Sequence, residues 1–237
     1  EPLRIVLVAD IQTDHLGEFQ REVLRRVVAE EPDLVLFAGD YLQCHSWDQH
    51  RALSEPWRAL IREAGLAPRL GAFAVKGDCE YADSWRELFA GTPVRPLLEE
   101  QVTFAAQGLE LYGLSLGASR RGRQSPPPRQ APYRIWLGHA PDVALTGPDA
   151  DLILAGHTHG GQVQLPFFGP LLTLSRVPRG WAAGRTELPG GGTLIVSRGI
   201  GMERDDAPRL RFLCRPELVV LDLVPVPKAA DAGPSGG

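Results

Sequence analysis

The sequence predicts an α/β fold, a four-layer α-β-β-α sandwich in which two mixed sheets are flanked by helices. Its first part alternates strand and helix patterns, which favours a mostly parallel sheet with right-handed crossovers. From Pro93 onward, short strand patterns separated by glycine and proline predict a second sheet. The 237 residues include 43% hydrophobic and 23% charged residues, as in average globular proteins. We therefore expect a single domain over residues 1–226, followed by a disordered tail over 227–237 that has nothing to bury.

The first part of the chain contains five predicted elements. Residues Leu3–Ala9 form an uninterrupted apolar run with β-branched side chains, typical of a strand buried on both faces. Phe19–Glu30 has its apolar residues on one helical face. Leu34–Ala38 predicts a second buried strand, Gln49–Ala64 a second amphipathic helix and Gly71–Val75 a third strand.

The second part contains eight short runs with strand character, each bounded by turn residues. In chain order they are Val102–Phe104, Leu109–Leu114, Ile135–Gly138, Leu152–Ala155, Val163–Leu165, Thr193–Ser197, Leu210–Leu213 and Leu218–Val224.

Composition excludes several classes of protein and leaves the compartment open. The formal net charge of −4, from 25 basic and 29 acidic residues, argues against a nucleic-acid partner, which requires a clustered basic face. No apolar run approaches the ~18 residues of a membrane span. Three cysteines without a CxxC pair do not define a redox compartment. The chain begins at Glu1, which leaves room for an upstream signal or membrane anchor, so cytoplasmic and membrane-peripheral locations both stay open.

Polar residues, most of them with carboxylate or imidazole side chains, follow five of the predicted strands. They are Asp10 with Gln12, then Asp40, then Asp78 with Cys79 and Glu80, then His139, and finally His157 and His159. Ligands of open α/β sheets bind beyond the carboxyl ends of the strands. We therefore expect these side chains to converge on one site.

The charges of this set predict metal ions. Asp10, Asp40 and Asp78 would repel one another if clustered and partly desolvated, unless a cation neutralised them. The imidazoles add neutral nitrogen ligands, and a mixture of Asp and His suits Mn²⁺, Fe or Zn²⁺ better than Ca²⁺. Seven candidate ligands, Gln12 included, exceed the needs of one ion. Two ions about 3.5–4 Å apart, bridged by one carboxylate, account for the number.

Each residue alone has a structural alternative. A single strand-end aspartate such as Asp10 is commonly a turn or cap residue, and a buried histidine such as His139 is commonly a core residue. Gln12 needs no role beyond that of a polar turn residue. The pair His157 and His159 is more specific, because two imidazoles one residue apart after a buried strand have little structural purpose. The ordered set is what carries the hypothesis.

The ordered blocks DIQ, GD, GDCE, GH and GHTH resemble the motifs of calcineurin-like metallophosphoesterases. The longer GHTHGGQVQLP and the later SRGIG and RPELVVLDL resemble a bacterial branch of small phosphodiesterases and phosphohydrolases, some of which act on lipid precursors. The resemblance covers Leu3 to Val224. It implies that Asp10, Gln12, Asp40 and His159 surround one metal ion, that Asp40, Asp78, His139 and His157 surround the other, and that Asp40 bridges them.

Three positions depart from the family pattern. Gln12 replaces the usual histidine, which favours harder ions such as Mn²⁺ or Mg²⁺ over Zn²⁺ at that position. Asp78 replaces an asparagine and adds a negative charge. Cys79 stands where the family has the histidine that steadies the transition state or protonates the leaving group. His15 and His45 are alternatives for that catalytic role.

The function implied is metal-dependent hydrolysis of a phosphodiester or pyrophosphate bond by a hydroxide that bridges two divalent ions. The substrate would be a small or lipid-linked phosphoester, and without a strong acid at Cys79 we expect leaving groups that need no proton. Tyr81, Trp47, Trp85 and the pair Phe167 and Phe168 either line an apolar pocket or are ordinary core residues. The alternative function is a binding scaffold of the same fold with weakened catalysis. A nuclease is disfavoured by the acidic net charge.

Overall fold

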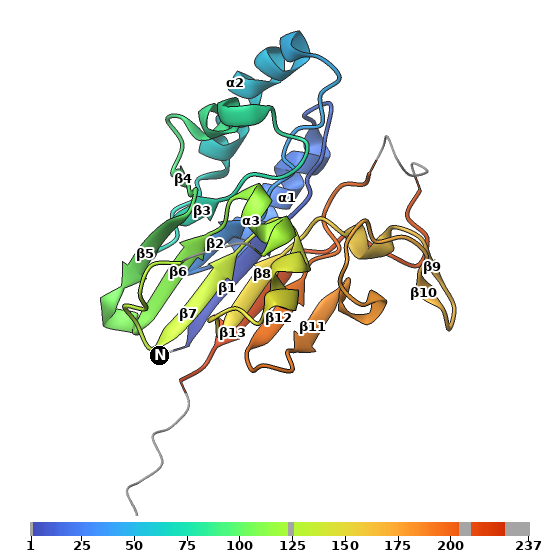
Figure 1. Ribbon diagram of the computed structural model, residues 1–237. Coiled ribbons are helices and arrows are strands. Elements are labelled where there is room, and N and C mark those ends of the chain that lie inside the picture. The colour runs from blue at the N-terminus through green and yellow to red at the C-terminus, as the bar shows by residue number, and fades with distance from the viewer. Residues whose placement is uncertain (1, 123–125, 204–209, 226–237) are drawn as a thin grey trace, which may run out of the picture.

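The computed structural model describes residues 2–122, 126–203 and 210–225 (Figure 1). The first of its two large sheets has the strand order β13-β1-β2-β3-β4, in which β13 is antiparallel to β1 and the other neighbours are parallel. The strands are β1 (Leu3–Val8), β2 (Leu34–Phe37), β3 (Ala72–Ala74), β4 (Val94–Pro96) and β13 (Val219–Leu223).

The second sheet has the order β11-β12-β8-β7-β6-β5. Its four central strands are parallel, and the two edge strands, β11 and β5, are antiparallel to their neighbours. The strands are β5 (Glu100–Phe104), β6 (Leu109–Gly113), β7 (Tyr133–Leu137), β8 (Leu152–Ala155), β11 (Gly184–Glu187) and β12 (Thr193–Val196). A separate small hairpin consists of β9 (Gln164–Leu165) and β10 (Gly169–Pro170).

Helices cover the outer face of each sheet, so the predicted four-layer sandwich is confirmed (Figure 1). The first sheet is covered by α1 (Glu18–Ala29), α2 (Trp47–Ala64) and the 3₁₀ segment η1 (Ala82–Phe89). The second is covered by η3 (Pro141–Thr146), against which α3 (Leu116–Arg121) packs. Three further 3₁₀ turns are η2 (Ala105–Gln107), η4 (His159–Gly161) and η5 (Arg179–Trp181).

The apolar run of β1 shows why its sequence does not alternate. Val6 and Val8 pack against the helices, whereas Ile5 and Leu7 point into the layer between the sheets. Successive side chains of a strand point to opposite faces, so a strand covered on both faces needs apolar residues throughout. The layer between the sheets is closed from the other side by side chains of β6, β7 and β8.

Local signals explain the helix ends. Ser46 caps α2, since its side chain accepts a hydrogen bond from the backbone N–H of Gln49 at 3.2 Å. The helix therefore begins at Trp47, two residues before the predicted start. It ends at Ala64, and the following Gly65 has the left-handed backbone conformation that glycine adopts at little cost.

The prediction of a strand over Leu210–Leu213 is wrong. Only Phe212 pairs there, through an isolated bridge to Val163. The apolar residues that suggested a strand are exposed, and Leu210 and Leu213 have 53% and 62% of their surface accessible. The predicted tail lies outside the described residues. None of the described helices has the length and hydropathy needed to cross a membrane.

Candidate metal centre

Three carboxylates and three imidazoles meet at the carboxyl ends of the central strands. Their ligand atoms form two groups, each within 4.8 Å of one another: Asp78, His139 and His157 in one, and Asp10, Asp40 and His159 in the other. The carboxylates follow β1, β2 and β3 of the first sheet, whereas the imidazoles follow β7 and β8 of the second. Each group therefore combines residues of both sheets.

In the first group, Asp78 faces two imidazoles. His157 Nδ1 lies 2.9 Å from Asp78 Oδ2, and His139 Nε2 lies 3.4 Å from the same oxygen. The opposite ring nitrogens point at backbone carbonyls: His139 Nδ1 lies 2.8 Å from the oxygen of Ala38, and His157 Nε2 lies 3.0 Å from that of Leu174. If these nitrogens carry the ring protons, the lone pairs of His139 Nε2 and His157 Nδ1 face the carboxylate.

The second group is fully buried. Asp10 is 0% exposed and Asp40 2% exposed, and His159 is 4% exposed. The backbone N–H of His157 donates to both carboxylate oxygens of Asp10, at 3.0 and 3.1 Å. His139 Nε2 lies 3.4 Å from Asp40 Oδ2, so one imidazole lies beside both groups.

These residues fit divalent cations. Buried carboxylates are costly without a compensating charge, and burial raises the pKa of Asp10. Among the described residues, the buried His139 Nε2 makes no hydrogen bond. The imidazole lone pair of His157 and the Asp78 oxygen would repel each other at 2.9 Å unless a proton or a metal ion lay between them. Aspartate oxygens and imidazole nitrogens together form the donor set of Mn²⁺, Fe and Zn²⁺ sites.

Five candidate ligands have left-handed backbone, which is uncommon for residues with a Cβ atom. Their φ angles are 51° for Asp10, 41° for Gln12, 55° for Asp40, 71° for His157 and 49° for His159. Such strain persists where the surrounding structure fixes it, and it clusters at functional sites.

Close packing of the strand-end loops requires glycine at two positions, each of which lies against an aspartate of the centre. A Cβ atom at Gly77 would overlap the backbone and carboxylate of Asp40, and one at Gly156 would lie 2.6 Å from Asp10 Oδ2. The Gly-Asp and Gly-His pairs of the sequence thus have a steric reason.

Glu80 is buried at the site, and its position after the third predicted strand gave no indication of its role. Its carboxylate accepts hydrogen bonds from the backbone N–H groups of Gly77, Tyr41 and Asp40, at 2.7, 2.6 and 3.3 Å. It thereby ties the loop after β3 to the loop after β2. Burial and the negative charge of Asp40 raise the pKa of Glu80 to about 7.

Gln12 lies beside this centre, and the nitrogen of its side-chain amide is already hydrogen-bonded. Its Nε2 donates to Glu203 Oε2 at 2.9 Å. Its Oε1 is buried without a hydrogen-bond partner among the described residues. The backbone N–H of Gln12 also donates to the carbonyl of Asp40 at 2.8 Å. The free amide oxygen is therefore the atom available for a cation.

Cys79 is placed at the centre, whereas the two alternative histidines are on the surface. The backbone N–H of Cys79 donates to Asp40 Oδ1 at 2.9 Å. Burial, together with the charges of Asp40 and Glu80, raises the pKa of its thiol. His15 is exposed and its ring contacts Asp14 Oδ1 at 2.9 Å. His45 is exposed as well. Neither belongs to the two ligand groups.

Two arginines complete the surroundings of the centre. Arg120 of α3 places Nη2 3.0 Å from Asp78 Oδ2 and 3.5 Å from His157 Nε2, with 45% of its side chain exposed. Arg211 donates to the carbonyls of Arg198 and Gly201 and lies 3.3 Å from His159 Nδ1. Burial and the charge of Arg211 lower the pKa of His159, which favours the neutral imidazole that a metal ligand requires. Neither arginine has a sequence motif that singles it out.

The aromatic residues proposed from the sequence separate into three environments. Trp85 belongs to the core beneath the helices. Trp47 and Tyr81 pack around the ring of His50. Phe167 and Phe168 are exposed, so neither a core role nor a pocket-lining role describes them.

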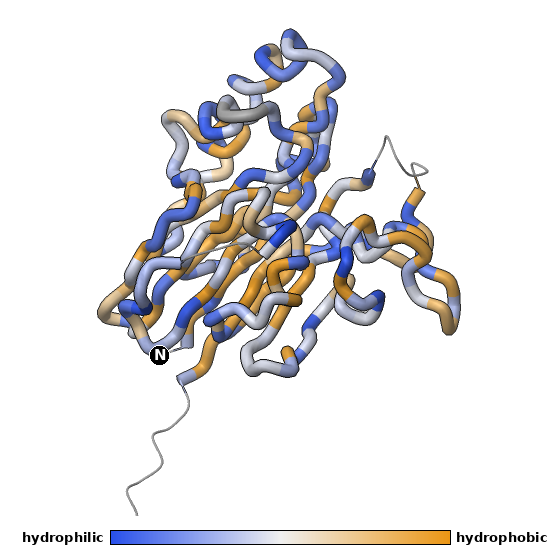
Figure 2. The backbone as a smooth tube through the Cα atoms, viewed as in Figure 1, coloured by the Kyte–Doolittle hydropathy of each residue, from blue (hydrophilic) through white to orange (hydrophobic). Residues whose placement is uncertain are grey.

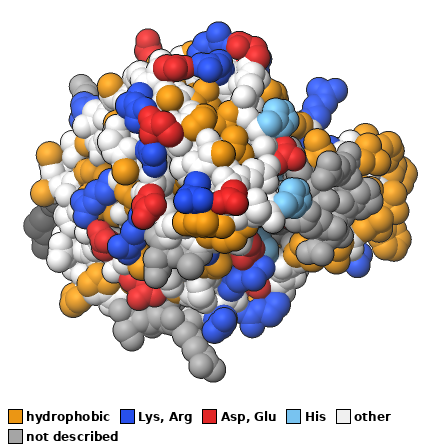
Figure 3. All heavy atoms as spheres, turned by 90° about the horizontal axis from the view of Figure 1, so that it is seen from above, with side chains coloured by type: hydrophobic (Ala, Val, Ile, Leu, Met, Phe, Trp, Pro, Cys, Tyr) orange, Lys and Arg blue, Asp and Glu red, His pale blue; other side chains and the backbone are white. Residues whose placement is uncertain are grey.

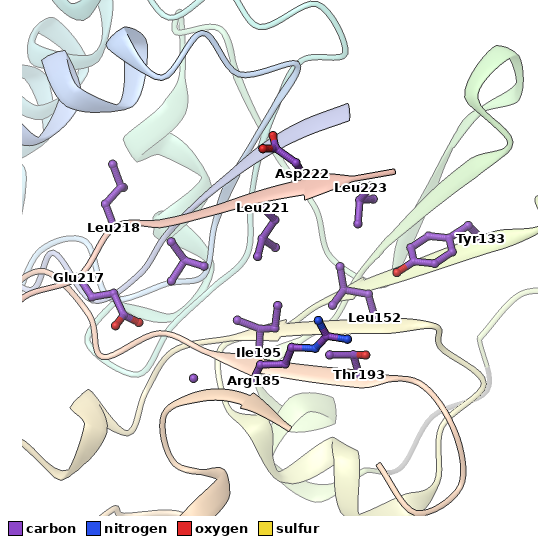
Figure 4. Close-up of a pocket in the computed structure, with 12 residues that line it drawn as sticks. Tyr133, Leu152, Arg185, Thr193, Ile195, Glu217, Leu218, Leu221, Asp222 and Leu223 are labelled. Carbon is purple, nitrogen blue, oxygen red and sulfur yellow. The ribbon is translucent and has the colours of Figure 1, made fainter. Parts of the chain in front are cut away.

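A separate pocket of about 460 Å³ lies between the edges of the two sheets (Figure 4). Leu221 of β13 and Ile195 of β12 point into it from opposite sides. Its lining contains none of the candidate ligands.

Comparisons with known proteins agree with this geometry. Residues 3–161 match the model of the calcineurin-like phosphoesterase family. "Uncharacterized metallophosphoesterase YkuE" of Bacillus subtilis is 47% identical over 94 residues, which cover 38% of this chain and 31% of that protein. "Phosphodiesterase YaeI" of Escherichia coli is 27% identical over 94% of this chain and 83% of its own length. This chain thus spans about a third of one of these relatives and most of the other.

A solved structure shows the same fold. The crystal structure of TT1561 from Thermus thermophilus superposes with a TM-score of 0.50 at 14% identity, covering 84% of this chain and 90% of that one. Since the family model covers more than half of the sequence, the chain belongs to the calcineurin-like phosphoesterase family.

Proposed function

We propose that this chain is a phosphodiesterase-type hydrolase that cleaves phosphodiester or pyrophosphate bonds at a dinuclear metal centre. The proposal is carried chiefly by the two groups of ligand atoms, which meet at one rim of the sandwich and each pair carboxylates with imidazoles. Asp78, His139 and His157 would hold one divalent ion, and Asp10, Asp40 and His159 the other, with Gln12 Oε1 available to the second. Mn²⁺ or Fe suits this donor set, and Zn²⁺ or Mg²⁺ is an alternative.

Divalent ions bound there would supply Lewis acidity, which lowers the pKa of water and neutralises charge on the phosphate. The protein's own part is to fix the ligands. The contacts of His139 with Ala38 and of His157 with Leu174 hold both rings in place, as outer partners of metal ligands do. Asp40 lies within reach of His139 of the other group, which suits it to be the shared carboxylate.

Arg120 is suited to orient the substrate. Its guanidinium lies beside Asp78 and His157 and is partly exposed, so a phosphate entering the site can contact it. Guanidinium groups match phosphate oxygens in geometry and charge. Cys79 is a weak acid because its pKa is raised. We therefore infer a preference for leaving groups such as phenolates or phosphates that depart without a proton.

The alternative is a metal-binding scaffold with little catalysis. Two observations favour it: Gln12 commits its amide nitrogen to Glu203, and the residue at position 79 is a poor proton donor. Metal retention without turnover of any phosphoester would support this alternative.

Metal analysis combined with a phosphoester panel tests the proposal. Purified protein is expected to hold divalent metal and to hydrolyse bis(4-nitrophenyl) phosphate with added Mn²⁺. Asp40→Asn removes charge from the shared position and should lower turnover by on the order of 100-fold, together with metal content. Asp48→Asn, at a residue whose side chain is 85% exposed on α2, is the matched control. Turnover and metal content of Asp40→Asn equal to those of the parent would contradict the assignment.

A further inference from the structure

Most of the exposed large apolar side chains of the described residues lie on two neighbouring segments. We call the following nine residues the apolar hairpin surface: Leu165, Phe167, Phe168, Leu171, Leu172, Leu174, Leu210, Phe212 and Leu213. Phe167 is fully exposed and Phe168 is 69% exposed. Large contiguous apolar patches are uncommon on soluble proteins and mark sites of interaction.

This surface stands away from the body of the sandwich. The β9-β10 hairpin extends from the side of the second sheet (Figure 1), and hydrophobic residues occupy much of its length (Figure 2). Seen from above, hydrophobic side chains gather at the same side of the molecule (Figure 3). Hydrogen bonds between the backbones of Gln164 and Phe212, at 2.9 Å, and of Phe212 and Gln162, at 3.0 Å, hold the two segments together.

Arginines flank the apolar hairpin surface in the sequence. Residues 161–175 contain no charged side chain, and residues 161–181 and 210–216 contain four arginines and no acid. Three of those arginines, Arg176, Arg179 and Arg215, are exposed. Among the described residues, Arg179 and Arg215 form no ion pair with an acid. Two exposed arginines without an acidic partner among the described residues, Arg179 and Arg215, thus flank the apolar segments, in a chain whose net charge is −4.

We propose that the apolar hairpin surface docks onto an anionic lipid bilayer. Apolar side chains at a protruding tip enter the boundary between head groups and acyl chains, and flanking arginines are attracted to anionic head groups. Association with a second copy through the same surface would bring the unpaired arginines of both copies together, which like-charge repulsion opposes.

Docking of this kind would bring the candidate metal centre to the lipid head groups. The root of the hairpin contacts that centre directly, because the carbonyl of Leu174 lies 3.0 Å from His157 Nε2. The side chain of Gln164 also donates to the carbonyl of Gly160, at 3.0 Å, next to His159. If the proposed function is correct, the substrates are phosphoesters carried on lipids in the bilayer. Membrane docking itself does not depend on hydrolysis.

Vesicle sedimentation tests the docking separately from the chemistry. The whole chain is mixed with vesicles of phosphatidylcholine alone or of phosphatidylcholine with phosphatidylglycerol. We expect sedimentation with the anionic vesicles, and Phe167→Ser combined with Phe168→Ser should weaken binding by about tenfold or more. The matched control is Phe19→Ser, at a residue on α1 that is 53% exposed and lies outside the apolar hairpin surface. Arg179→Gln with Arg215→Gln should reduce the preference for anionic lipid.

Two further measurements keep the outcomes distinct. Phe167→Trp should show a blue shift of its added fluorescence with anionic vesicles, measured against the parent's five tryptophans. Hydrolysis of the soluble aryl diester by the double serine variant should equal that of the parent.

Absence of vesicle binding by the parent, or equal binding by the double variant, would overturn the proposal. A parent dimer in light scattering that the double variant converts to monomer, without vesicle binding, would instead identify a second copy as the partner. An inactive parent that still binds vesicles would count against the hydrolase alone.

Discussion

Two opposing effects act on the pKa of the His139 imidazole. Its complete burial alone would lower the pKa, but the carboxylates of Asp40, Asp78 and Asp10 outweigh burial and raise the pKa to about 10. Without a metal ion, this ring is therefore protonated at neutral pH and serves as the local positive charge. A metal ion takes over that role only when the proton leaves.

Metal binding should therefore release a proton and tighten as pH rises. The pKa of His139 is raised from 6.5, the ordinary value that applies to the unfolded chain, to about 10 in the folded, metal-free protein. The proton therefore stabilises the folded protein fully below pH 6.5, and this stabilisation is lost as pH rises through 10. The same proton competes with a metal ion for the ring. Between these limits the affinity for Mn²⁺ should increase by about tenfold per pH unit. Calorimetry at several pH values, in buffers with different ionisation enthalpies, measures both effects. An affinity independent of pH over this range would contradict the prediction.

Cys79 sets the expected range of leaving groups. Cys79→His introduces an imidazole, which is a stronger acid than the Cys79 thiol, and proton donation to a leaving group contributes about 10²-fold to 10⁴-fold. We expect faster turnover of alkyl phosphodiesters and little change for aryl diesters. The comparison of kcat for the two substrates measures this, with Cys79→Gln as the control for size. An equal gain on both substrates would argue against a missing proton donor.

At the residue scale, the sequence pointed to side chains that the structure brings together, but not to the residues that surround them. Asp10, Asp40 and His139 stood out because a polar residue directly follows an apolar strand. Arg211 did not, because its contact with His159 joins positions that are 52 residues apart. Nothing in the local sequence around such a residue indicates a partner at that distance.

At the scale of elements, the loops after β2 and β3 act as one unit. Glu80 accepts hydrogen bonds from backbone N–H groups of both loops, and so positions Asp40 and Asp78 relative to each other. Hydrogen bonds to a charged acceptor are worth more than neutral ones, and leaving buried N–H groups unpaired is costly.

Glu80→Gln should therefore weaken both stability and activity. The glutamine amide presents N–H groups to backbone N–H groups, and we expect a loss of about 2–4 kcal/mol in the free energy of unfolding. Turnover of the aryl diester should fall by about tenfold or more as the ligands lose their positions. Urea unfolding and kinetics measure the two effects. Glu87→Gln, at an exposed position of η1, is the control and should change neither.

Element prediction succeeded where burial dictated the pattern and failed where it did not. Runs covered on both faces, such as Leu3–Val8 and Leu152–Ala155, were visible as uninterrupted apolar segments. The edge strand Gly184–Glu187 was missed because its sequence, GRTE, has no apolar pattern. The prediction of a strand over Leu210–Leu213 was wrong because its apolar residues lie on an exposed surface. Composition alone does not distinguish such a surface from a buried strand.

At the scale of the whole molecule, the candidate centre concentrates negative charge that one protonated imidazole, His139, compensates only in part. Buried Asp10 and Asp40 lie at the junction of the two sheets, where burial of an anion opposes folding. A ligand that binds only the folded state stabilises it in proportion to the logarithm of its concentration over Kd.

Divalent metal should therefore raise the melting temperature. At a free concentration 100 times Kd the gain is about 2.7 kcal/mol, which corresponds to roughly 5–10 °C for a domain of this size. Differential scanning fluorimetry with Mn²⁺ and with EDTA measures the shift, which Asp40→Asn should reduce and Asp48→Asn should retain. Identical melting curves for the parent with Mn²⁺ and with EDTA would contradict a folded-state metal site.

The division of ligand types between the sheets has a kinetic consequence. Every acid of the two groups comes from one sheet and every ring from the other, so neither half of the sandwich can assemble a complete coordination shell alone. During refolding, cation capture would have to wait until the two halves have docked in register. The time at which the ion binds would then report when the two halves dock. No ion would bind while each half is still forming its own hydrogen-bonded structure.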